Sequence, residues 1–345
     1  MAASGAAAPA TWVYVSNADS QDISVLQLDR AAGRLTPVAT VPVGGVAMPM
    51  AVNRDKKLLY VASRSQPFRV LTFAIDGATG GLNKLGESAL ADSMANIDLD
   101  PSGQWLFAAS YGGNKITVNS IGNDGLVGAV QQLVRTAPKA HAIHADASGR
   151  YVFATSLGGD NLSRWHFDAA TGTLSANEPA LVNVSPANTG PRHFLWDKAQ
   201  KHVYLINELD GGVDVFAYDA AKGAMRHLQR STVVPPGFAG KVWAADLQIS
   251  PDGHYLYGSE RTSSTLTTFK VDAATGRLQV VGQTPTEKTP RSFAIDSTGR
   301  FLVAAGQDSH AVSLHLIDSA TGLPGAGNSQ PAGKNPNWVE IVDFS

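Results

Sequence analysis

Short apolar runs alternate with polar turns along the whole chain. Runs such as VYVSN, LYVAS and YVFATS are rich in β-branched and aromatic residues and are bounded by Gly, Asp or Pro. Such runs are typical of β-strands. No apolar period of about 3.6 is sustained over roughly 12 residues, as a long amphipathic helix would require. The pattern therefore predicts an all-β protein.

One strand-bearing element recurs along the chain. A turn opens on Asp or Ser, reaches Gly three residues later, and leads into an apolar run that ends on small or polar residues. Clear copies begin at Asp100, Asp146, Ser250 and Asp296, looser copies begin at Asn53 and Asp197, and the run WVYVSN supplies a seventh strand end. Asp caps its own turn and Gly accepts positive φ, so each copy suits a tight reversal between antiparallel strands.

A second element follows each copy of the first. It is a strand that closes on an acidic residue, followed by a turn, a Gly and an apolar residue. Copies begin at Leu28, Ile75, Phe167, Tyr218, Val271 and Ile317, with a shortened one at Ile121. The two elements repeat every 45–53 residues or so, about the length of one four-stranded propeller blade.

The chain starts and ends inside the repeat, and its two ends together supply one complete unit. The chain starts on a run of the second-strand type (Trp12–Asn17) and ends on PNWVEIVDF, which has the form of a first strand, as in PRHFLWD and PRSFAID. The last strand is expected to complete the first blade, which leaves no exposed sheet edge. We predict an all-β, seven-bladed β-propeller with four-stranded antiparallel blades, its ring closed by the C-terminal strand. Residues 11–345 form this single domain, and residues 1–10 form a disordered tail.

Composition narrows the possible partners. Of 345 residues, 43 % are hydrophobic and 16 % are charged, which is enough apolar material for a large core. A net charge of −2 disfavours nucleic acid and anionic membranes as partners. The absence of cysteine excludes disulfides and thiolate chemistry. The opening MAASGAAAPA is a poor signal peptide. We expect a cytoplasmic location, with the periplasm left open, and the oligomeric state is open.

The repeat places polar residues from distant blades on common positions. Five residues before the first turn lie His141, Arg192 and Arg291, where the innermost strand begins. The residue that closes the next strand forms a second ring, made of Ala18, Arg64, Tyr111, Leu157, Glu208, Arg261 and Gln307. In an antiparallel pair, the start of one strand lies beside the end of the other. Both rings are therefore expected at one mouth of the central channel.

Each of these residues also has a structural interpretation. The arginines can bind strand-end carbonyls of neighbouring blades, and Glu208 can pair with Arg261. His141 can be a polar rim residue, His144 a core histidine, and Tyr111 a packing aromatic. The chain contains no G-x-x-x-x-G-K-[ST], G-x-G-x-x-G, G-x-S-x-G or H-E-x-x-H motif. We expect no cofactor and no metal, although metal binding is not excluded.

From about Trp12 onward the chain resembles the seven-bladed propeller lactonases, which include bacterial 6-phosphogluconolactonases of propeller type and fungal carboxymuconate cyclases. GPRHFLWDKAQKHVYLINEL is similar to the family's G-P-R-H and the following strand pair that ends in Glu-Leu. LYGSERT is similar to L-Y-x-S-N-R, with Glu260 in place of Asn. TPRSFAIDSTGRFLVAAGQDS resembles P-R-x-F-x-I-D-x-x-G, and PKAHAIHAD resembles P-H-x-H, with Lys139 in place of the first His.

The resemblance implies a lactonase that hydrolyses the internal ester of a small anionic sugar-acid lactone, as 6-phosphogluconolactonases do. Base-activated water would attack the ester, and arginines would stabilise the oxyanion or hold a carboxylate. The catalytic residues are expected to be His141, Arg192, Glu208 and Arg261. Either His141 is the base and Glu208 orients it, or Glu208 is itself the base. His144 replaces His141 if the register slips. The substrate-binding residues are expected to be Arg64, Tyr111, Lys139, His144, His193, Arg291 and Gln307. Two other functions stay open, namely a cycloisomerase acting on a muconate-type or aldaric acid lactone, and a propeller that binds an anion without turnover.

Overall fold

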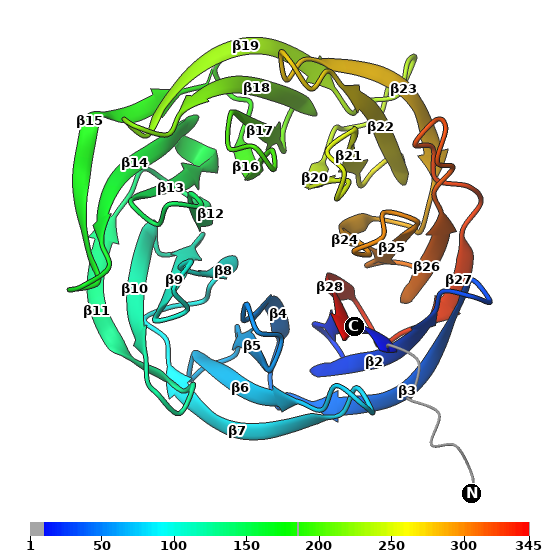
Figure 1. The fold of residues 1–345 in the computed structure, drawn as a ribbon, viewed down its shortest axis with the longest axis horizontal. Helices are drawn as coiled ribbons and strands as arrows, with labels where there is room; N and C mark the ends of the chain where they lie inside the picture. The colour runs from blue at the N-terminus through cyan, green and yellow to red at the C-terminus, as the bar shows by residue number, and fades with distance from the viewer. Residues whose placement is uncertain (1–9, 185, 345) are drawn as a thin grey trace, which may run out of the picture.

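Seven four-stranded antiparallel sheets surround a central channel in the computed structural model, which describes residues 10–184 and 186–344 (Figure 1). The predicted fold class is confirmed. Blade 1 contains β28 (Pro336–Phe344), β1 (Ala10–Asn17), β2 (Asp22–Asp29) and β3 (Arg34–Pro42). Blade 2 contains β4 (Ala47–Val52), β5 (Leu58–Ser63), β6 (Arg69–Ile75) and β7 (Leu82–Ala89). Blade 3 contains β8 (Asn96–Leu99), β9 (Trp105–Ser110), β10 (Lys115–Ile121) and β11 (Val127–Arg135).

The remaining blades follow in chain order. Blade 4 contains β12 (Ala140–Ala145), β13 (Tyr151–Ser156), β14 (Asn161–Asp168) and β15 (Thr173–Asn183), with a 3₁₀ turn, η1 (Leu157–Gly159), after β13. Blade 5 contains β16 (Pro191–Trp196), β17 (His202–Asn207), β18 (Gly212–Asp219) and β19 (Ala224–Thr232). Blade 6 contains β20 (Ala244–Ile249), β21 (Tyr255–Glu260), β22 (Thr265–Val271) and β23 (Leu278–Pro285). Blade 7 contains β24 (Pro290–Ile295), β25 (Phe301–Gly306), β26 (Ala311–Leu316) and β27 (Asn328–Pro331).

The ring closes in blade 1 through the two ends of the chain, as predicted. Strand β28 pairs with β1 from Ala10 opposite Phe344 to Asn17 opposite Pro336. Ala10 therefore belongs to a strand, where the prediction placed the end of a tail. Residues 1–9 of that predicted tail lie outside the described residues. Within the described part of the chain, no helix is long and apolar enough to cross a membrane.

The repeated Asp–Gly turns have the geometry expected of them. In the turn of blade 7, Asp296 Oδ1 accepts hydrogen bonds from the backbone N–H groups of Arg300 and Phe301, both at 2.9 Å. Gly299 adopts φ = 71°, a conformation that side chains other than glycine rarely take. These turns fix where each innermost strand ends and the next strand begins.

Neighbouring blades are joined by tyrosines at equivalent positions. In four blades, a buried tyrosine of the second strand donates its hydroxyl to a glycine carbonyl in the outer turn of the next blade. The bonds run from Tyr14 to Gly80, from Tyr60 to Gly125, from Tyr204 to Gly276 and from Tyr257 to Gly322, at 2.8–3.1 Å. The hydrogen bond satisfies a buried hydroxyl, and the aromatic ring packs one sheet on the next. The two blades therefore keep a fixed spacing.

A bulge near the start of several innermost strands decides which side chains enter the channel. In β16, Pro191 lies opposite Asn207 and Phe194 lies opposite Leu205, so the strand holds one residue more than its partner there. Strands β4, β12 and β20 have the same shift. A bulge interrupts the alternation of side chains between the two faces. Arg192 and His193 can therefore both reach across to blade 6 although they are adjacent in the chain.

Candidate active site

Glu208 lies at the centre of the predicted cluster and binds two arginines. Its Oε2 accepts a hydrogen bond from Arg192 Nε at 2.9 Å and forms an ion pair with Arg261 Nη2 at 2.8 Å. Each arginine is only 1 % exposed. Burial alone would raise the pKa of Glu208, but the two arginines outweigh it and hold the pKa below its ordinary value. Glu208 is therefore ionised at neutral pH, and it fixes two guanidinium groups at the channel mouth.

Arg192 spans two blades because its counterpart in blade 6 is small. Its Nη1 also donates to the backbone carbonyl of Ala245. Ala245 is fully buried and occupies in β20 the position that Arg192 holds in β16. The absence of a long side chain at Ala245 leaves room for the guanidinium. Arg192 can therefore both bind a carbonyl of the neighbouring blade and serve the site, since the Ala245 carbonyl and Glu208 orient the same guanidinium group.

Arg261 stacks on Trp243, a residue that the sequence did not single out. Its guanidinium carbon lies 3.7 Å from the centre of the Trp243 ring, and its Nε donates to the Trp243 carbonyl at 3.0 Å. Glu260, which stands where the resembling family has Asn, accepts a hydrogen bond from the Trp243 N–H at 2.7 Å and is fully buried. Burial lowers the pKa of Arg261 to about 9, so the group stays charged at neutral pH. Glu260 therefore holds the segment that carries Trp243.

Arg291 brings a third guanidinium to the same mouth without a fixed partner. Burial and then the nearby Arg192 and Arg261 lower its pKa well below the ordinary arginine value, and Glu208 opposes them. Among the described residues, no hydrogen bond or ion pair is formed by its side chain. Arg64 contributes to the same repulsion, although its own Nε donates to Ser93 Oγ at 2.6 Å. Unmatched positive charge of this kind is what a bound anion would neutralise.

His141 supplies a neutral imidazole beside these arginines. It is 3 % exposed, and its Nδ1 has no hydrogen-bond partner among the described residues. Burial, followed by the charges of Arg192 and the other cations, holds its pKa well below 6.5. The ring meets Tyr111 edge-on at 6.0 Å, and the ammonium of Lys139 lies 5.6 Å from the centre of the Tyr111 ring. The structure therefore groups these three residues from blades 3 and 4 as predicted.

Three predicted site residues form their hydrogen bonds outside the cluster around Glu208. His144 is three residues further along β12 than His141, and its Nδ1 is 2.7 Å from Asp98 Oδ2 in a cavity at the other end of the channel. His193 bonds Asp246 in that cavity, although its ring edge also meets His141 at 5.1 Å. Gln307 binds Asn335 at 2.7 Å on the rim between blades 7 and 1. No hydrogen bond joins His141 to Glu208 among the described residues, so the structure does not show Glu208 orienting the histidine.

A comparison with protein families identifies the fold's relatives. Residues 12–341 match the family described as lactonase, 7-bladed beta-propeller. The chain belongs to this family. The match covers essentially the whole propeller, so it confirms the resemblance seen in the sequence.

Curated relatives and solved structures agree with this membership. The lactonase is 39 % identical over 330 residues to a 6-phosphogluconolactonase of Pectobacterium carotovorum subsp. carotovorum, covering 96 % of this chain and 98 % of that protein. It is 38 % identical over 330 residues to a 6-phosphogluconolactonase of Serratia proteamaculans, with the same coverage. The structure of a periplasmic gluconolactonase of Pseudomonas aeruginosa superposes with a TM-score of 0.90 at 28 % identity, covering 97 % of this chain and all of that one.

The arrangement at the mouth suits ester hydrolysis. Guanidinium groups held by a carboxylate can stabilise a developing oxyanion. A neutral imidazole with a free nitrogen can accept a proton from water. A further guanidinium without a partner can bind a second anionic group of the substrate, since its planar fork matches carboxylate and phosphate oxygens.

Proposed function

We propose that this lactonase hydrolyses the internal ester of a sugar-acid lactone of the 6-phosphogluconolactone type at the arginine-lined mouth. The observation that carries the proposal is the cluster around Glu208. There, Arg192 and Arg261 are fixed by one carboxylate, while Arg291 and His141 Nδ1 have no partner among the described residues. The names of the curated relatives and of the solved gluconolactonase support the same chemistry.

In the proposed mechanism His141 is the base. The unprotonated nitrogen of its neutral ring takes a proton from a water molecule while the water oxygen attacks the lactone carbonyl. Negative charge develops on the carbonyl oxygen, where Arg192 and Arg261 stabilise it. The ring C–O bond then breaks, and the leaving alkoxide takes the proton back from the histidine. The new carboxylic acid loses its remaining proton to solvent, and the product leaves as a hydroxy-carboxylate. A positioned base contributes about 10²–10⁴-fold, and one oxyanion donor contributes roughly 2.7–4 kcal/mol.

Glu208 acts in this proposal as the anchor of the two arginines. Its carboxylate is ionised, and its Oε2 forms ion pairs with both guanidinium groups. Such a carboxylate is a weak base, because protonation would cost both ion pairs. We therefore assign the base to His141, the first of the two options left open by the sequence.

The remaining cations would bind the anionic group of the substrate. Arg291 has no fixed partner among the described residues, Arg64 lies near it, and Lys139 is exposed beside Tyr111. A phosphate carries more charge than a carboxylate and matches this excess of cations better. The proposal therefore favours a phosphorylated sugar lactone over an aldaric or muconate-type lactone, in line with the names of the relatives.

Acid release from a panel of lactones tests the proposal. We expect the wild-type protein to hydrolyse 6-phosphogluconolactone faster than glucono-1,5-lactone and muconolactone, in a pH-stat assay corrected for spontaneous opening. If His141→Ala and Arg192→Ala both retained wild-type kcat/KM, the site assignment would be wrong. Anions that raise the melting temperature of the protein without any hydrolysis of the panel would point to a binding protein instead.

The expected cytoplasmic location and the oligomeric state stay predictions to be tested. Cell fractionation of the native host, with the protein expressed from its own promoter, would decide the compartment. Light scattering at several concentrations would give the oligomeric state. Neither result affects the assignment of the active site, since every residue in the cluster comes from one chain.

A further inference from the structure

The far end of the channel contains a cavity of about 470 Å³ whose lining includes none of the arginines of the mouth. Strand β16 runs away from the mouth, from Pro191 opposite Asn207 to Trp196 opposite Val203. Trp196, at the end of the strand, lines the cavity, and so does Gln200 on the turn that follows. Arg192 does not line it. The cavity therefore opens where the innermost strands end. Its volume is that of a small-molecule site.

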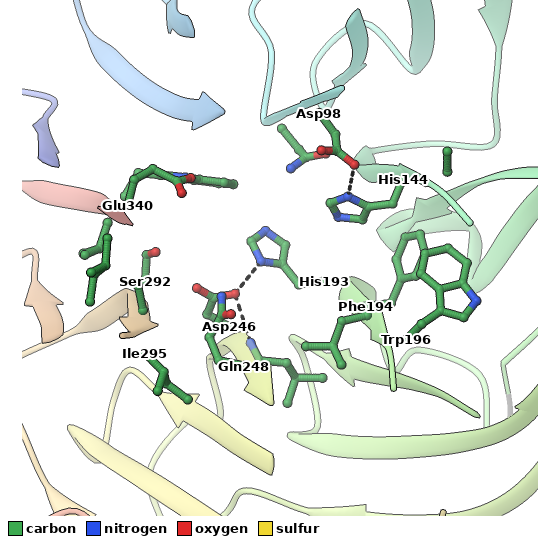
Figure 2. Close-up of a pocket in the computed structure, with 18 of the residues that line it drawn as sticks. Asp98, His144, His193, Phe194, Trp196, Asp246, Gln248, Ser292, Ile295 and Glu340 are labelled. Carbon is green, nitrogen blue, oxygen red and sulfur yellow. Dashed lines mark hydrogen bonds and ion pairs between the residues drawn. The ribbon is translucent and has the colours of Figure 1, made fainter. Parts of the chain in front are cut away.

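The carboxylates give this cavity its charge. Three carboxylates from three different blades line it, namely Asp98, Asp246 and Glu340. Of the described residues that line it, none is Lys or Arg. Figure 2 shows Asp98, Asp246 and Glu340 around one space, with the rings of His144 and His193 between them. This acidic cavity is thus opposite in charge to the mouth.

His193 carries an unused acceptor in the same place. Its Nδ1 lies 2.7 Å from Asp246 Oδ1, and since a carboxylate can only accept, Nδ1 carries the proton. Nε2 of the neutral ring is then an acceptor, and it has no partner among the described residues although His193 is only 8 % exposed. In Figure 2 this nitrogen is turned away from Asp246, into the space between Glu340 and His144. A buried acceptor without a donor is unfavourable, so the geometry calls for a ligand that donates.

The walls of the acidic cavity favour an organic donor. Trp196, Trp338 and Phe194 line it beside the carboxylates. Aromatic faces attract organic cations. No group of three or more His, Cys, Asp or Glu side chains in the described part of the chain is arranged to hold a metal ion. The combination of acceptors and aromatic surface fits an ammonium ion on a short apolar skeleton.

We propose that the acidic cavity is a binding site for a small primary organic ammonium ion, held by Asp98, Asp246, Glu340 and the free Nε2 of His193. The site would work independently of lactone hydrolysis at the other end of the channel. A primary ammonium supplies N–H donors for the histidine as well as charge for the carboxylates. A quaternary ammonium supplies charge alone and would bind more weakly.

The state of Glu340 supports this site. Burial first, and then the neighbouring Asp98 and Asp246, raise its pKa to about 7, while a hydrogen bond from Trp338 Nε1 at 2.8 Å opposes the rise. His144 and His193 are the other titratable groups that line the cavity. A bound cation would favour the ionised carboxylate. Binding at neutral pH should therefore release protons, and the affinity should rise with pH as the carboxyl ionises.

Isothermal titration with 1,4-diaminobutane tests the proposal, with 1,4-butanediol as the neutral counterpart and tetramethylammonium as the quaternary one. We expect one site for the diamine, weaker binding of tetramethylammonium, none of the diol, and proton release in buffers of different ionisation enthalpy. Glu340→Gln should weaken diamine binding by at least about tenfold, as loss of a charged hydrogen bond does. Asp98→Asn, whose side chain is partly exposed, should weaken it too and covers the case in which Glu340→Gln misfolds.

Glu178→Gln is the matched control, because Glu178 is exposed on the outer strand β15. This variant should bind the diamine as the wild type does. No binding of 1,4-diaminobutane at millimolar concentration would overturn the proposal. Equal binding by the wild type and by folded Glu340→Gln and Asp98→Asn would overturn it as well, and so would diol binding as tight as that of the diamine.

Discussion

The two ends of the central channel are built from the same innermost strands but carry opposite charge. At one end Arg192, Arg261 and Arg291 surround a single ionised carboxylate, Glu208. At the other end, carboxylates from three blades line a cavity into which no described Lys or Arg projects. Position along the strand decides which end a side chain serves. An anionic substrate is therefore attracted to one end and repelled by the other.

Three histidines show how close the cationic and acidic ends of the channel are to each other. His141 and His144 lie on one strand, three residues apart, yet the first contacts the arginine cluster and the second pairs with Asp98. His193 lies between the two ends, with its ring 5.1 Å from that of His141 and its Nδ1 on Asp246. Side chains that are close together along the channel therefore meet opposite charges, cationic at the mouth and acidic in the cavity.

Substitution of the base is expected to give the largest effect on this comparison. His141→Ala should lower kcat/KM for 6-phosphogluconolactone by about 10²–10⁴-fold, because His141 lies among Arg192, Arg261 and Arg291 and a positioned general base typically contributes that much. Steady-state kinetics by acid release measure it. His254→Ala is the control, since that histidine lies exposed on the turn between β20 and β21 and should leave the rate unchanged. A drop of less than threefold or so for His141→Ala would remove it as the base.

Loss of an oxyanion donor should come next. Arg192→Ala is expected to lower kcat by roughly 10²–10³-fold with a smaller change in KM, because the interaction is strongest when charge has developed on the substrate oxygen. Arg192→Lys should recover part of the rate, since it keeps the charge but not the planar fork. Arg226→Ala on the exposed face of β19 serves as the control. A change in KM alone would assign Arg192 to substrate binding.

The unpartnered arginine should decide between phosphorylated and plain lactones. Arg291→Met is expected to raise KM for 6-phosphogluconolactone by about tenfold or more, through loss of a charged hydrogen bond, and to leave KM for glucono-1,5-lactone nearly unchanged. Parallel kinetics on the two substrates measure the difference. Equal effects on both would show that Arg291 does not bind the phosphate.

The smallest expected effect is a difference in how the two ends respond to pH. The pKa of Glu208 is lowered on folding, so its stabilising ion pairs are present above about pH 4.5 and are lost as the pH falls through the folded-state pKa. The pKa of Glu340 is raised to about 7, so its contribution is most favourable below about pH 4.5 and is lost as the pH rises through 7. The two ends therefore titrate with opposite sign.

Urea unfolding between about pH 3 and pH 8 measures these slopes. Glu340→Gln should gain stability relative to the wild type as the pH rises from about 4.5 to 8, since it cannot ionise. Glu178→Gln should follow the wild-type curve, because that residue is exposed. Parallel curves for Glu340→Gln and the wild type would show that the pKa of the Glu340 carboxyl is not perturbed.

The closed ring of blades and the residues at the channel mouth could both be predicted from the sequence, because both depend on the repeat alone. Each Asp–Gly turn fixes the ends of two strands, so residues at a fixed distance from the turn share one level of the channel. That rule placed Arg192, Glu208 and Arg261 together, and the structure joins them through one carboxylate oxygen. It also grouped His141 and Tyr111, whose rings meet edge-on.

The rest depends on local geometry that the repeat does not encode. The bulge in β16, which lets Arg192 and His193 both reach blade 6, becomes visible only in the pairing with β17. The path of the segment before β20 decides that Trp243 stacks on Arg261. Asp246 and Glu340 are isolated carboxylates on separate blades, so no motif marks the acidic cavity.

A crystal structure with bound 6-phosphogluconate, the product acid, tests the central claim most directly. The account predicts its carboxylate between Arg192 and Arg261, close to the free nitrogen of His141, and its phosphate on Arg291. Density for the acid in the cavity lined by Asp98 and Glu340, with the arginine-lined mouth empty, would contradict it.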